Sequence, residues 1–118
     1  MSTPRPDVNR ALSTLKDFQR DTVDHVFARM YEASPPALRF LIADEVGLGK
    51  TMVARGIAAR AVDKLWDTVE RIDVIYVCSN QAIAKQNFSR LAIAGRRIFQ
   101  TLLPFGDFHV LFHIYRSL

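Results

Sequence analysis

The chain has 118 residues, which is the size of one domain with a hydrophobic core, and we expect no second catalytic domain within it. Hydrophobic residues make up 49% of the sequence and charged residues 24%, a composition that excludes a wholly disordered chain. The formal net charge of +4 favours polyanionic partners such as nucleic acid, but only as a general field effect.

Two features of the sequence concern the compartment. The single cysteine, Cys78, lies in an apolar run and has no partner for a disulfide within the chain, so we expect a buried thiol in a reducing environment. The first residues lack the apolar segment of a secretion signal, and no apolar stretch reaches the roughly 18 residues that span a bilayer. We therefore expect a soluble, cytoplasmic protein.

The N-terminal third predicts a short arm followed by helices. Residues 1–8 contain two prolines among polar residues and are expected to form a flexible arm. Apolar residues then recur at helical spacing from Asn9 to Glu32, and a break near Asp17 divides this segment into a short and a longer helix. Pro35 and Pro36 end the second helix, because proline lacks a backbone donor and disfavours helix in the residue before it.

The middle of the chain alternates between strand and helix. Leu38 to Ala43 is a short apolar run between prolines and a glycine loop, which favours a buried parallel strand. After the loop Asp44 to Gly49, residues Lys50 to Trp66 place apolar side chains on one helical face. Ile72 to Cys78 is rich in β-branched residues and predicts a second strand, and a helix from Gln81 to about Ala94 follows it. This order predicts an α/β fold with a right-handed βαβ unit and parallel strands.

The segment Gly95 to Leu118 is apolar and aromatic but shows no sustained periodicity, and Pro104 and Gly106 interrupt it. We therefore expect an irregular C-terminal tail, in which Phe108 to Tyr115 is a candidate strand. A sheet of only two strands would leave its edges and one apolar face uncovered, so we expect either this tail or a partner chain to cover them.

The loop before Lys50 has the features of a phosphate-binding loop, or P-loop. A triphosphate needs backbone N–H donors, a helix N-terminus, a cation and a magnesium ligand. Gly47 and Gly49 let the backbone turn closely around phosphate oxygens. Lys50 would reach the β- and γ-phosphates, and the hydroxyl of Thr51 would hold Mg²⁺. The alternative is an ordinary strand-to-helix turn whose lysine is merely solvated.

The general P-loop pattern, the Walker A motif, has its first glycine where this chain has Asp44. The sequence Asp-Glu-Val-Gly-Leu-Gly-Lys-Thr instead resembles motif I of superfamily two helicases and translocases, Swi/Snf-like enzymes and related bacterial DEAD/DEAH-type helicases. This resemblance implies a RecA-like domain that binds ATP and Mg²⁺, with Lys50 as the catalytic residue and Thr51 as the metal ligand. The nucleotide-binding residues that it implies are Gln19, Asp44, Glu45, Val46, Gly47, Leu48, Gly49, Lys50 and Thr51.

Gln19 stands in the run Leu15 to Arg20, which resembles the helicase segment where an aromatic residue and a glutamine precede the first strand. A glutamine amide offers a donor and an acceptor together, so it can pair with the N6 and N7 edge of adenine. The resemblance implies that Gln19 selects ATP over GTP. The alternative is a surface glutamine on an amphipathic helix whose neighbour Phe18 lies in the core.

Ile75 to Asn80, together with the helix that follows, is similar to helicase motif Ia, where the end of a strand meets the nucleic-acid backbone. The side chains of Ser79 and Asn80, with the N–H groups of the helix start, suit contact with phosphates. The same groups suit N-capping of the helix equally well, and the sequence leaves both roles open. For the intact parent we expect a nucleic-acid partner; DNA is favoured over RNA, and the sequence leaves the choice open.

Hydrolysis of ATP needs further groups: a carboxylate for Mg²⁺ and the attacking water, and an arginine for the γ-phosphate. The resemblance assigns the first to a Walker B motif and the second to an arginine finger of a second RecA-like domain, and we find neither in the sequence. We therefore expect residues 9–94 to be the N-terminal part of a RecA-like ATP-binding domain without hydrolysis of its own. Residues 95–118 stay unassigned. Three origins are open: a truncated or frameshifted frame, a genuine short protein, and half of a split helicase whose partner chain carries the rest. The alternative function is a non-catalytic nucleotide-binding or partner-interaction module.

Overall fold

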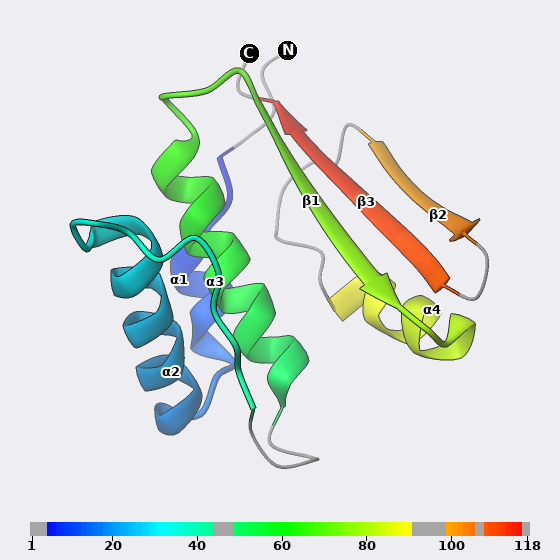
Figure 1. Cartoon of the computed structure of the whole chain (residues 1–118), viewed down its shortest axis with the longest axis horizontal. Coiled ribbons are helices and arrows are strands. Elements are labelled where there is room, and N and C mark those ends of the chain that lie inside the picture. The colour runs from blue at the N-terminus through cyan, green and yellow to red at the C-terminus, as the bar shows by residue number, and fades with distance from the viewer. Residues whose placement is uncertain (1–4, 44–48, 91–98, 106–107, 117–118) are drawn as a thin grey trace.

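The helices of the N-terminal half form one side of the molecule, and a three-stranded sheet together with the last helix forms the other (Figure 1). The computed structural model describes the backbone of residues 5–43, 49–90, 99–105 and 108–116, and side chains as far as residue 87. In chain order the elements are α1 (Val8–Ser13), α2 (Asp17–Phe27), the π-helical turn η1 (Ala28–Glu32), α3 (Lys50–Leu65), β1 (Arg71–Cys78), α4 (Gln81–Arg90), β2 (Phe99–Phe105) and β3 (Phe108–Arg116).

The helices of the N-terminal half follow the sequence pattern. The predicted break near Asp17 is confirmed, because α1 ends at Ser13 and α2 begins at Asp17. Asp7 caps α1, since its carboxylate accepts a hydrogen bond from the backbone N–H of Arg10 at 3.0 Å. The long helix predicted from Lys50 is confirmed as α3.

Part of the arm predicted at residues 1–8 lies outside the described residues, which begin at Arg5. The guanidinium of Arg5 donates hydrogen bonds to the carboxylates of Asp63 and Asp67, at 2.6 and 2.8 Å. The hydrogen bond to Asp63 raises the pKa of Arg5 above its ordinary value. Because these side chains are open to water, the ion pairs contribute little to stability, but they hold the start of the chain against the last turn of α3.

The hydrophobic core is built around α3, which packs against α1 and α2 and also contacts β1. Gly56 lies where α3 meets the N-terminal helices, and a Cβ added there would lie 2.9 Å from Cγ2 of Val23. The absence of a side chain at Gly56 therefore allows the close approach of these helices. Two clusters of buried residues lie in this core, one of Leu15, Val23 and Val53 and the other of Ala11, Ala59, Val62 and Trp66.

The strand predicted at Ile72 to Cys78 is confirmed as β1, but its partner lies in the tail. β1 pairs antiparallel with β3, from Arg71 opposite Arg116 to Cys78 opposite His109. β2 pairs antiparallel with the other edge of β3, which gives the strand order β1-β3-β2. The candidate strand in the tail is therefore confirmed as β3, whereas β2 falls in a segment that we expected to be irregular.

The segment Leu38 to Ala43, predicted as a buried parallel strand, forms no strand. It runs beside α2 instead, where the ring of Phe40 meets the ring of His25 edge-on at a centroid distance of 5.8 Å. Leu38 and Leu41 are 87% and 84% exposed, so the apolar run is not buried as its composition suggested. The described strands are paired antiparallel, and the expected parallel pairing is not formed among them. The RecA-like assignment stays a proposal.

The structure bears on two expectations, one about the burial of Cys78 and one about membrane-spanning segments. Cys78 is half-buried rather than buried, and its thiol donates a hydrogen bond to the carbonyl of Asn80 at 3.4 Å. Within the described residues, no helix combines the length and the apolar character that crossing a bilayer requires.

Candidate nucleotide-binding site

The predicted phosphate loop leads into the N-terminus of α3. Its residues Asp44, Glu45, Val46, Gly47 and Leu48 lie outside the described residues, so the described part of the site begins at Gly49. Gly49 caps α3 with φ 80° and ψ 42°, in the left-handed region that glycine enters without a steric penalty. The chain therefore needs glycine at this position to turn into the helix.

Lys50 and Thr51 are the first two residues of α3, with Lys50 exposed and Thr51 half-buried. The first hydrogen bonds inside the helix run from Met52 and Val53 to the carbonyl of Gly49, so the N–H groups of Lys50 and Thr51 have no carbonyl partner within the helix. These donors point along the helix axis, toward the end where the helix dipole is positive.

The electrostatics of this helix end favour an anion. The first turn of α3 contains no acidic residue, and no side chain caps Gly49. A lysine at the positive end of a helix is unfavourable by about 0.3–1 kcal/mol, so Lys50 does not stabilise the helix where it stands. An anion bound there would interact with the N–H groups, the helix dipole and the ammonium group together.

Gln19 is the predicted site residue that the structure brings to this helix end. A Cβ added at Gly49 would overlap Nε2 of Gln19, so the amide lies directly against the backbone of Gly49. The N-termini of α2 and α3 lie at the same end of the molecule (Figure 1). Gln19 is 7% exposed while Phe18 is 45% exposed, which is the reverse of a surface glutamine beside a core phenylalanine.

Ser79 and Asn80 lie between β1 and α4, and both are exposed. Oδ1 of Asn80 accepts hydrogen bonds from the N–H groups of Ala82 and Ile83 at 2.8 and 3.3 Å, so the capping role is confirmed for Asn80. Within the described residues, no hydrogen bond joins this pair to the residues at the start of α3. The predicted nucleic-acid contact is not tested by this geometry.

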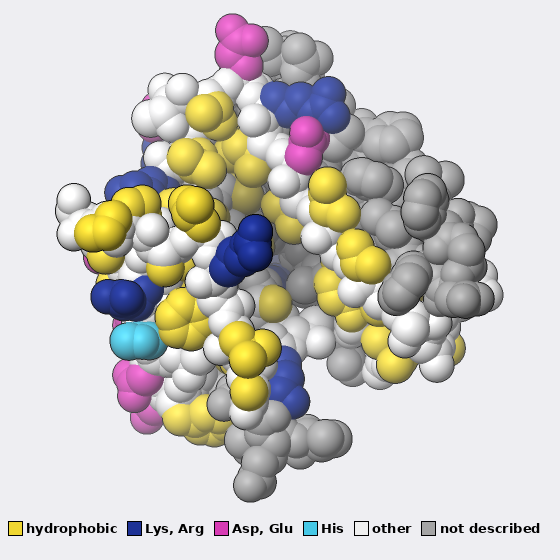
Figure 2. Space-filling view, viewed as in Figure 1, with side chains coloured by type: hydrophobic (Ala, Val, Ile, Leu, Met, Phe, Trp, Pro, Cys, Tyr) yellow, Lys and Arg dark blue, Asp and Glu magenta, His cyan; other side chains and the backbone are white. Residues whose placement is uncertain are grey.

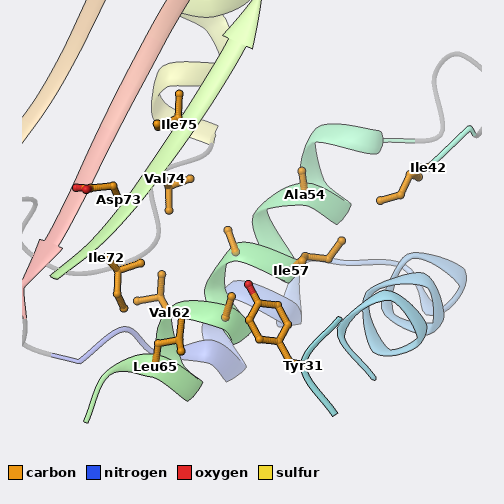
Figure 3. A pocket seen from close by; sticks show the side chains of 12 residues that line it. Tyr31, Ile42, Ala54, Ile57, Val62, Leu65, Ile72, Asp73, Val74 and Ile75 are labelled. Carbon is orange, nitrogen blue, oxygen red and sulfur yellow. The ribbon is translucent and has the colours of Figure 1, made fainter. Parts of the chain in front are cut away.

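An apolar groove of about 440 Å³ lies between α3 and β1. Side chains of α3 and β1 face each other across it, with Tyr31 and Ile42 on the helical side (Figure 3). Figure 2 shows hydrophobic side chains on both sides of the hollow between the helices and the sheet. Asp73 is the charged residue among those that line the groove, so its walls do not suit a triphosphate. The sequence did not reveal this groove, because its walls come together only through the tertiary fold.

Neither the comparisons with other proteins nor the described His, Cys, Asp and Glu side chains assign a function. No protein-family model matches the chain, and neither a curated protein nor a solved structure matches it significantly. In the part of the chain that the structure describes, no group of three or more His, Cys, Asp and Glu side chains could hold a metal ion. The predicted Mg²⁺ ligand, Thr51, would need the nucleotide itself to complete the coordination.

Proposed function

We propose that this chain binds ATP with Mg²⁺ as the N-terminal part of the RecA-like domain of a superfamily two helicase or translocase. The observation that carries the proposal is the run Asp44 to Thr51, whose last two residues begin a helix of 16 residues that is capped by Gly49 in the left-handed backbone conformation. In this proposal Lys50 neutralises the β- and γ-phosphates, and the hydroxyl of Thr51 holds Mg²⁺.

Three features of the described residues support an anion at this place. The N–H groups of Lys50 and Thr51 have no partner inside the helix, the first turn has no carboxylate, and Lys50 is exposed to solvent. The burial of Gln19 against Gly49 links the second sequence motif to the first, although the two are thirty residues apart in the chain. Nucleotide binding explains why these features occur together.

We further propose that the intact parent acts on nucleic acid, DNA rather than RNA, in the cytoplasm. Ser79 and the exposed start of α4 would contact the phosphate backbone, because helix N-termini bind phosphate through their N–H groups. The net charge of +4 supports a polyanionic partner.

Asn80 allows the capping role to be separated from the phosphate contact. Aspartate caps helices as well as asparagine does, so Asn80→Asp should leave the free energy of unfolding within about 0.5 kcal/mol, whereas Asn80→Ala should lower it by about 1 kcal/mol. The added negative charge should weaken binding of single-stranded DNA about threefold or more if Asn80 faces a phosphate. Fluorescence anisotropy with labelled DNA and urea denaturation measure the two effects. Unchanged DNA affinity for Asn80→Asp would leave Asn80 with capping alone.

A measurement of ATP hydrolysis distinguishes the proposed fragment from a complete helicase or translocase. We expect the purified chain to bind ATP but to show no hydrolysis stimulated by nucleic acid, because it supplies neither a Walker B carboxylate nor an arginine finger. A coupled assay with single- and double-stranded DNA and RNA measures this. Robust turnover that disappears in Lys50→Ala would contradict the expectation.

A second candidate function is a non-catalytic module that binds nucleotide and a partner chain, such as half of a split helicase. The apolar groove between α3 and β1 favours it, since Ile75, one of the residues that line the groove, is 58% exposed. Exposed apolar surface of this kind is typical of faces that another polypeptide covers. Both candidate functions include ATP binding. They differ in that only the second predicts that a partner chain restores ATP hydrolysis.

A further inference from the structure

The side chain of Gln19 is held between the start of α2 and the start of α3. Gln19 is the third residue of α2, and its Oε1 accepts a hydrogen bond from the backbone N–H of Lys16 at 2.9 Å. This bond is the side-chain half of a capping box, which fixes the glutamine rotamer at the helix N-terminus. The other end of the amide, Nε2, faces Gly49, and Cδ would lie 3.6 Å from a Cβ added there.

This packing restricts the backbone at Gly49, the last residue of the phosphate loop. Gly49 adopts φ 80°, and the residue that follows it supplies the proposed phosphate cation. The amide of Gln19 fills the space beside the Cα of Gly49, so it limits the conformations that the backbone can take at the entrance to α3. The amide of Gln19 is 7% exposed and already accepts a hydrogen bond. We therefore expect it to support the backbone of Gly49 rather than to bind a ligand from solvent.

The same geometry disfavours base reading by Gln19. Bidentate recognition of adenine needs the carbonyl and the NH₂ group of a glutamine both turned toward the ligand. Here the carbonyl of Gln19 accepts from Lys16 N–H, and the NH₂ group lies against the backbone of Gly49. Contact with a base would require the side chain to leave both positions.

We infer that Gln19 is a positioning residue for Gly49, the described end of the phosphate loop, and that it supports triphosphate binding whatever the base. This inference rests on the proposed function, because it concerns the same loop. Its consequence is that loss of the Gln19 amide weakens ATP, GTP and a base-free triphosphate by the same factor. A residue that selected adenine would instead affect ATP alone.

The test compares three ligands, each with Mg²⁺: ATP, GTP and inorganic tripolyphosphate. Isothermal titration gives the affinity of each for the unmodified chain, Gln19→Ala and Gln19→Glu. Glutamate keeps the acceptor for Lys16 N–H, but it places a carboxylate at a position that is 7% exposed, so we expect the cap to form and the melting temperature to fall. Gln86→Ala, which removes an exposed glutamine from α4, is the matched control.

We expect Gln19→Ala to weaken all three ligands by about tenfold, the effect of losing one interaction of hydrogen-bond strength, and Gln19→Glu to weaken all three at least as much because its carboxylate also repels the phosphates, while Gln86→Ala changes nothing. A loss confined to ATP would overturn the inference and assign Gln19 to adenine, with the proposed function intact. Unchanged binding of all three ligands in both variants would also overturn it. If the unmodified chain binds none of the three, the proposed function fails, and the inference fails with it.

Discussion

Replacement of Lys50 by alanine is expected to weaken the binding of ATP by about 10- to 100-fold. Lys50 is exposed at the first position of α3, beside helix N–H groups that have no partner within the helix. Losing a charge-assisted hydrogen bond costs about 1.5–3 kcal/mol, and each 1.4 kcal/mol is tenfold in affinity. The fold should not suffer, since alanine favours helix and removes a cation from the positive helix end.

Titration of ATP into the variant measures the affinity, and Lys64→Ala is its matched control. Lys64 is an exposed lysine in the last turn of the same helix, so its loss removes the same charge from the chain at the opposite helix end. Lys64→Ala should bind ATP as the unmodified chain does. Equal losses in the two variants would indicate a general effect of net charge, and undiminished affinity in Lys50→Ala would remove the basis for the loop assignment.

Replacement of Gly49 by alanine is expected to lower the free energy of unfolding by about 2–3 kcal/mol and to impair nucleotide binding. A side chain at φ 80° costs about 1–2 kcal/mol. The new Cβ would also overlap Nε2 of Gln19, so the glutamine would have to move and its hydrogen bond to Lys16 would be strained, at a further cost of about 1 kcal/mol. Denaturation by urea measures the total.

A double variant divides this effect into its two parts. In the Gln19→Ala background the amide is absent, so Gly49→Ala should cost only the conformational penalty of about 1–2 kcal/mol. The cost of the double variant should therefore be smaller than the sum of the two single costs. Strict additivity would mean that the two residues do not touch in solution.

The helices could be predicted from the sequence because their signals are local. Apolar residues at helical spacing, and a capping residue at the right place, depend only on neighbours within a few positions. Asn80 shows this clearly: an asparagine between a β-branched run and a helical pattern is a candidate cap, and its Oδ1 accepts hydrogen bonds from two N–H groups of α4. The same reasoning placed the start of α3 at Lys50.

The strand pairing could not be predicted, because it depends on contacts far apart in the chain. The apolar run Leu38 to Ala43 has the composition of a buried strand, yet a short apolar run does not specify what it packs against. In the structure Phe40 packs against His25 of α2, and β1 takes β3 as its antiparallel partner. Nothing in the periodicity of the tail distinguishes pairing with β1 from an irregular course.

The candidate site was predictable only in part, for related reasons. The residue types at Gly49, Lys50 and Thr51 indicate phosphate binding from the sequence alone. The left-handed backbone conformation of Gly49 is consistent with that prediction. The burial of Gln19 against Gly49 could not be read from the sequence, because it depends on how α2 packs against α3. The groove beside Ile75 was hidden for the same reason.

The most direct test of the central claim is an NMR titration of the ¹⁵N-labelled chain with ATP and Mg²⁺. We expect the backbone amides of Gly49, Lys50 and Thr51 to show the largest chemical-shift changes, because their N–H groups would donate hydrogen bonds to phosphate oxygens. The amides of the groove on β1, such as Ile75, should change little. No shift at saturating ATP, or shifts centred on the groove instead of the start of α3, would contradict the account.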